Sequence, residues 1–166
     1  MNPAEGVRPA TGVIVAVLSA MGSWLLLQVM RSWGGAYPAI TWMGLVPLVA
    51  LTALVLVMSW QIRRYVRGKG TLRPSPQRGR GTLVGAQAAA LGGAALLGWY
   101  VANALVHVPN ADVPSQQVHL SWALVHAVAA LALSVAGYVG QAWCRIPPGE
   151  DDDDGDAAAE GDLAYG

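Results

Sequence analysis

The residues best suited to chemistry are two histidines and an aspartate that lie close together in the second half of the chain. His107, Asp112 and His119 carry side chains that Zn²⁺ accepts as ligands. No tight spacing such as H-x-x-x-H occurs among them, so this set is a weak candidate for a metal site. We therefore expect no metal and no other cofactor.

Four polar residues interrupt the apolar part of the chain and are candidate intramembrane sites: Gln87, Asn103, His126 and Gln141. Polar groups in hydrocarbon face protein or water rather than lipid. His126 has two interpretations, a neutral ring hydrogen-bonded to a neighbouring helix or a proton relay or ligand. Gln87 and Asn103 are expected to form hydrogen bonds between helices. Because no nucleophile–base pair accompanies them, we expect no catalytic residue and no enzyme activity.

The elements that must position these residues are four apolar segments without charged residues in their interiors, at about 11–30, 40–60, 82–106 and 118–143. Each is long enough to cross a bilayer, for which a helix needs about 20 apolar residues. Long continuous runs favour helices over barrel strands, and only these two structures satisfy the backbone in lipid. Trp60 and Trp143 end two of the segments, as interfacial tryptophans do. The sequence predicts an all-α polytopic membrane protein with four transmembrane helices.

Basic residues gather in segment 61–80, between the second and third apolar segments. They are Arg63, Arg64, Arg67, Lys69, Arg73, Arg78 and Arg80. Cytoplasmic loops of membrane proteins carry an excess of Lys and Arg. The sequence therefore predicts a cytoplasmic loop here, with residues 1–10 and 148–166 on the same side. Short connectors on the other side predict two antiparallel hairpins within residues 11–147.

The basic segment and the acidic tail have several possible roles. The segment either determines topology only, contacts anionic lipids or binds a cytoplasmic partner. Nucleic acid is not an expected partner, because no aromatic stacking platform or known motif accompanies the charge. The tail, residues 148–166, contains a run of aspartates that repel one another, so we expect it to be disordered.

Small residues recur along the third and fourth segments at spacings that suit helix packing. They are Gly81, Gly85, Ala89 and Gly93 in the third segment, and Ala127, Ala130, Ser134 and Gly137 in the fourth. In lipid, helices associate through such faces because their backbones can approach closely. The pattern predicts a central third helix with the fourth against it, and leaves open whether part of the face binds a second copy.

Three stretches together resemble a known family: the Arg-rich segment, residues 81–90 (GTLVGAQAAA), and Trp99-Tyr100 followed by residues 108–114 (VPNADVP). The family consists of actinobacterial membrane proteins classed as a domain of unknown function, often encoded beside folate-biosynthesis genes. The resemblance spans roughly residues 10–147. It implies four transmembrane helices and a bacterial plasma-membrane location, and it supplies no activity and no functional residues.

The function expected from the sequence is that of a non-enzymatic plasma-membrane protein with an interaction or accessory role. Its expected partners are the lipid bilayer, anionic lipids, a membrane or cytoplasmic protein, or a second copy of the chain. The alternative is a small transporter, or a transporter subunit, that works as an oligomer.

Overall fold

The structure is a computed structural model that describes residues 6–35, 40–66 and 76–144. Its helices are α1 (Pro9–Ser32), α2 (Leu45–Val66), α3 (Pro76–His107) and α4 (Pro114–Trp143), with 3₁₀ turns η1 (Trp42–Gly44) and η2 (Val108–Asn110). All four helices are long and apolar enough to cross a membrane, and the described residues contain no strand. The predicted all-α class with four membrane-spanning helices is confirmed.

Proline sets the starts of the helices. Pro9 and Pro114 open α1 and α4, and Pro76 opens α3. A proline in the first turn loses nothing, because its missing N–H has no acceptor within the helix there. In α2, Pro47 has no N–H to donate to the carbonyl of Met43 four residues earlier. Because α2 begins at Leu45, this proline also lies within the first turn of its helix.

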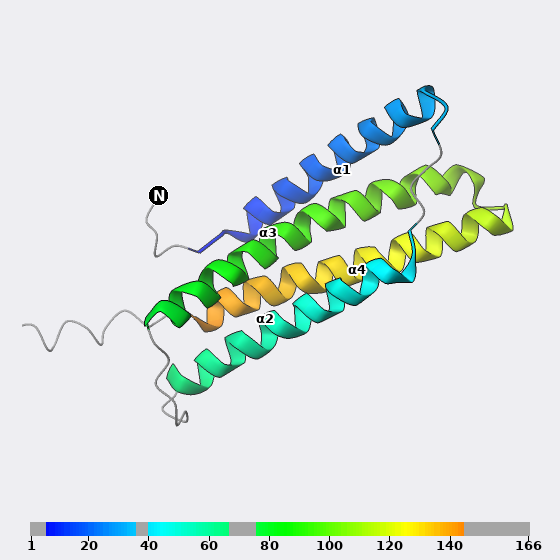
Figure 1. Cartoon of the computed structure of the whole chain (residues 1–166). Coiled ribbons are helices and arrows are strands. Elements are labelled where there is room, and N and C mark those ends of the chain that lie inside the picture. Colours follow the sequence, from blue (N-terminus) through cyan, green and yellow to red (C-terminus); the bar gives the residue numbers. More distant parts are fainter. Residues whose placement is uncertain (1–5, 36–39, 67–75, 145–166) are drawn as a thin grey trace, which may run out of the picture.

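The helices lie side by side in the order α1, α3, α4, α2 (Figure 1). α3 and α4 form the central antiparallel pair, with α1 against α3 and α2 against α4. Consecutive helices run antiparallel, as expected. Within the described residues, however, α1 and α2 flank the central pair and do not pack together as a hairpin. The reason is that the glycines and alanines that permit close approach lie mainly on α3 and α4.

Close backbone contacts hold the central pair together. A Cβ atom added to Gly93 would lie 2.5 Å from the backbone nitrogen of Ser134, and one added to Gly137 would meet the backbone of Ala90. The Ser134 hydroxyl donates a buried hydrogen bond of 2.9 Å to the Ala90 carbonyl. On the other side of α3, the Ser19 hydroxyl of α1 donates to the carbonyl of Ala95 at 2.7 Å. Small residues and serine hydroxyls therefore supply the closest contacts between these helices.

The two ends of the bundle differ in composition. At one end, which we call the basic end, α1 and α3 begin and α2 and α4 finish (Figure 1). The opposite end, which we call the connector end, carries η1 and η2. α2 and α3 both extend into the segment expected as a loop, 61–80, since a helix can continue past the hydrocarbon into polar sequence. The side chains of Arg67, Lys69, Arg73 and Arg78, and the tail 148–166, lie outside the described residues.

The outer surfaces of the bundle are apolar. In the most apolar windows of α1 and α2, 11% of residues are buried, compared with 39% in α3 and 50% in α4. Large side chains such as Leu18 and Val128 are 63% and 67% exposed. Apolar surface on this scale suits contact with lipid, because exposing apolar side chains to lipid tails, unlike exposing them to water, costs no free energy.

Candidate functional site

One face of α3 carries small residues that no described residue approaches. A Cβ atom added to Gly81, Gly85 or Gly92 would meet nothing within 4 Å, and Ala88 on the same side is exposed. We call these four residues the small-residue face of α3. Each glycine costs a helix about 1 kcal/mol relative to alanine. Three uncovered glycines therefore point to a close approach that the described chain does not supply.

The predicted ridge of Gly81, Gly85, Ala89 and Gly93 is divided by the structure. Gly93 packs against α4 and Ala89 is half-buried, whereas Gly81 and Gly85 are exposed. The physical reason is geometric. Residues four apart drift by about 40° per step around a helix of 3.6 residues per turn, so one end of the ridge turns toward α4. The predicted set on α4 is buried throughout: Ala127, Ala130, Ser134 and Gly137.

His126 is a fully buried histidine with one ring nitrogen lacking a partner. Its Nδ1 lies 2.8 Å from the carbonyl oxygen of Trp122, which can only accept, so Nδ1 carries the proton. The Nε2 atom has no hydrogen-bond partner among the described residues and faces Gly44, whose added Cβ would lie 3.2 Å away. The ring of Tyr100 lies 5.0 Å from that of His126. The expected bond to a neighbouring helix is wrong, since Nδ1 binds the backbone of its own helix.

The other intramembrane polar residues behave differently from one another. Asn103 is buried and donates to the Trp99 carbonyl of its own helix at 2.9 Å, so the expected interhelical bond is wrong. Gln87 is half-buried and makes no hydrogen bond within the described chain. Gln141 does join elements, because its Oε1 accepts a 2.8 Å hydrogen bond from the backbone N–H of Val7, just before α1. Sequence reasoning missed Ser19 and Tyr100 because their roles depend on which helices become neighbours.

The histidines of the connector end form a pair without the aspartate. The rings of His107 and His119 stack with centroids 5.4 Å apart, and His107 Nδ1 lies 2.6 Å from the Gln116 Oε1. Asp112 is exposed, and the described residues contain no group of three side chains placed to hold a metal ion. The weak metal candidate is therefore not assembled by this fold. Gln116 was missed, although it lies one turn before His119 on the same helix.

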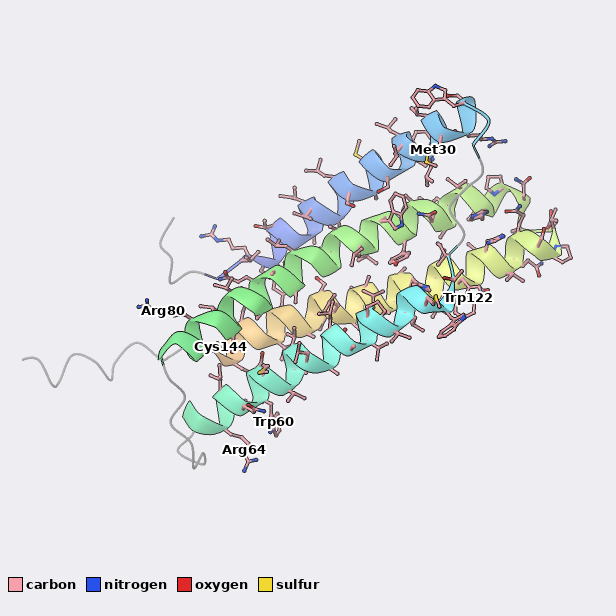
Figure 2. All side chains as sticks on the ribbon, viewed as in Figure 1. Met30, Trp60, Arg64, Arg80, Trp122 and Cys144 are labelled. Atoms are coloured by element: carbon pink, nitrogen blue, oxygen red, sulfur yellow. The ribbon has the colours of Figure 1, made fainter. Side chains whose placement is uncertain are left out.

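At the basic end, Arg63 lies against two tryptophans. Its guanidinium carbon is 4.7 Å from the ring centroid of Trp143 and 6.0 Å from that of Trp60. Arg64 and Arg80, the other basic residues of the segment with described side chains, are exposed, and both project from the bundle (Figure 2). The sequence predicted that these arginines contact lipid or a partner. It did not predict the contact between Arg63 of α2 and Trp143 of α4, because the two residues belong to different helices.

Cys144, the single cysteine, directly follows the last residue of α4 at the basic end (Figure 2). Burial raises the pKa of its thiol, and only the thiolate reacts with alkylating reagents. We expect alkylation by iodoacetamide near neutral pH to be several-fold slower than for a free cysteine, and to accelerate as the pH rises toward the raised pKa. The matched control is Arg64→Cys in a Cys144→Ser background, which presents an exposed thiol nearby. Equal rates for the two thiols at every pH would contradict the burial of Cys144.

The comparison with protein-family models confirms the resemblance to a domain of unknown function. A family model described as "Protein of unknown function (DUF3180)" matches residues 13–148, which include α2, α3 and α4 and all of α1 after its first turn. No curated protein and no solved structure matches the chain. Since the matched region covers most of the sequence, the chain belongs to the DUF3180 family of proteins of unknown function.

Proposed function

We propose that this chain is a non-enzymatic multi-pass membrane protein that acts by assembly, and that it associates with a second copy through the small-residue face of α3. The observation that supports this is the contrast among the glycines of α3. A Cβ atom added to Gly93 or Gly98 would collide with the backbone of α4 or α1, respectively. A Cβ atom added to Gly81, Gly85 or Gly92 would meet nothing within 4 Å. The expected site of action is the plasma membrane of an actinobacterium, with the basic end in the cytoplasm.

The spacing of this face suits a helix–helix contact in lipid. Gly81, Gly85, Ala88 and Gly92 follow one another at steps of four, three and four, which is the heptad pattern of left-handed packing. The face extends about 16 Å along the axis at 1.5 Å per residue. Glycine and alanine let two backbones approach, and van der Waals contact then supplies the attraction that hydrophobicity cannot supply in lipid.

The double variant Gly85→Leu/Gly92→Leu tests this proposal. The two leucines should hold the backbones apart, so the variant is expected to be monomeric where the wild-type chain is dimeric. The measurement is the mass of the protein in mild detergent by light scattering. Gly22→Leu is the matched control, since Gly22 of α1 also has nothing within 4 Å of an added Cβ. A strictly monomeric wild-type protein that captures no partner contradicts the proposal.

A transporter, or a transporter subunit, is the second candidate function. The observation that favours it is the unpartnered Nε2 of His126, buried in α4 where a proton or a polar solute could bind. Four helices line a pathway only as an oligomer, so this candidate also requires an association surface. Uptake into vesicles separates the two functions, because a His126→Gln variant with unchanged uptake of each candidate solute removes the transporter.

A further inference from the structure

The side chains of Arg63, Trp60 and Trp143 form a cluster that ties the ends of α2 and α4 together; we call it the Arg–Trp cluster. The two indole rings meet edge to face, with centroids 5.8 Å apart and planes at 70°. The Arg63 guanidinium lies over the Trp143 ring at 4.7 Å, within the range of a cation–π contact. Arg63 is therefore held in place by aromatic contacts, unlike the exposed Arg64 beside it.

The cation–π contact is not a hydrogen bond, so it leaves the N–H donors of this guanidinium available. A guanidinium donates through five N–H groups in its own plane, and an aromatic ring on its face uses none of them. Within the described residues, no hydrogen bond or ion pair joins Arg63 to another side chain or to the backbone. An oriented cation with unused, in-plane donors fits a planar pair of acceptor oxygens, and phosphate oxygens provide such a pair.

The position of the cluster along the helices indicates that the phosphate belongs to a lipid headgroup. Trp60 and Trp143 end the apolar parts of α2 and α4, where interfacial tryptophans lie at the level of the lipid headgroups. Arg63 follows Trp60 by three residues on the same side of α2, about 4.5 Å further from the hydrocarbon. Arg64 adds a second positive charge. Asp112, the acidic residue of the described chain, lies between η2 and α4 at the opposite, connector end.

We propose that the Arg–Trp cluster binds the phosphate diester of an anionic phospholipid, such as phosphatidylglycerol, at the basic end of the bundle. The guanidinium of Arg63, a planar fork of N–H donors, donates hydrogen bonds to two phosphate oxygens, and the Trp143 ring holds this fork in its orientation. The positive charge of Arg64 favours a lipid with net negative charge over a zwitterionic one. This site is independent of the small-residue face of α3, so a monomeric protein retains it.

Native mass spectrometry of the full chain with added phosphatidylglycerol or phosphatidylcholine tests the proposal. Two variants that keep the charge provide the comparison: Arg63→Lys loses the planar fork, whereas Arg64→Lys changes a residue that no ring holds in place. We expect Arg63→Lys to weaken phosphatidylglycerol binding about tenfold, and Arg64→Lys to leave it within about twofold. Trp143→Leu should weaken binding in the same direction as Arg63→Lys, because the fork loses the surface that orients it.

Three outcomes would overturn the assignment. The first is equal binding by the Arg63→Lys and Arg64→Lys variants, which would reduce the site to general surface charge. The second is equal affinity for phosphatidylglycerol and phosphatidylcholine. The third is full displacement of the lipid by soluble glycerol phosphate, which would mean that the site binds soluble phosphate-containing anions and not a lipid headgroup. Removal of residues 150–166 is the control for competition by the acidic tail, and it should not abolish the difference between the two lysine variants.

Discussion

Gly93→Ala should destabilise the bundle by about 1–3 kcal/mol, whereas Gly92→Ala, one residue earlier, should leave it unchanged or up to about 1 kcal/mol more stable. An added Cβ at Gly93 would lie 2.5 Å from the nitrogen and 2.8 Å from the Cα of Ser134. These are backbone atoms, which cannot rotate away, so α3 and α4 must separate. The same separation lengthens the hydrogen bond from Ser134 to the Ala90 carbonyl.

Neighbouring glycines in one helix make this comparison a sharp one. Gly92 has nothing within 4 Å of an added Cβ, so alanine there brings only its better helix propensity. The measurement is the free energy of unfolding in mixed micelles of increasing SDS content, at a protein concentration where the chain is monomeric. Equal stability of the two variants would mean that α3 and α4 do not approach each other at Gly93.

Gly98→Leu should release α1 from α3 while leaving the α3–α4 pair intact. An added Cβ at Gly98 would meet the carbonyl oxygen of Ala16 and lie 2.7 Å from the nitrogen of Ala20, so a leucine cannot be accommodated between these helices. Most of the surface of α1 is exposed, and another tie to the bundle is the hydrogen bond from the Val7 N–H, just before the helix, to Gln141 of α4. The hydrogen bond from Ser19 to the Ala95 carbonyl would be lost with the release of α1.

Distances between spin labels on α1 and α4 report this release. Labels attached to cysteines at Met21 and Leu131, both exposed, should give one narrow distance distribution in an otherwise wild-type chain lacking Cys144. In the Gly98→Leu variant, the distribution should broaden. Gly22→Leu is the control and should preserve the narrow distribution, because nothing lies near that glycine. An unchanged distribution in Gly98→Leu would show that α1 is held elsewhere.

Hydropathy located the membrane-spanning parts of the chain well but not the full helices. The predicted first segment, 11–30, corresponds to α1 at Pro9–Ser32, and the fourth, 118–143, to α4 at Pro114–Trp143. α3 was expected from residue 82 and begins at Pro76. Hydropathy measures where hydrocarbon ends, whereas a helix ends where its backbone loses hydrogen-bond partners. The two limits coincide only when a helix stops at the interface.

The neighbours of each helix could not be read from the sequence. Small-residue spacing placed α3 and α4 together, but nothing local indicates that α1 and α2 lie on opposite sides of that pair. For the same reason, the partners of individual polar residues were missed. His126 and Asn103 bind backbone carbonyls one turn earlier in their own helices, a bond that any buried polar side chain on a helix can make. The contact of Arg63 with Trp143 depends on α2 meeting α4.

Disulfide crosslinking between copies in native membranes tests the central claim, that α3 uses one face for α4, another for α1 and a third for a second copy. In a two-fold dimer of chains that share one orientation, equivalent residues on the contact face lie opposite each other. In a Cys144→Ser background, Ala88→Cys should therefore yield a crosslinked dimer on mild oxidation. Val101→Cys, also exposed but about 140° around α3, should not. Crosslinking at position 101 but not at 88, or at neither, would contradict the account.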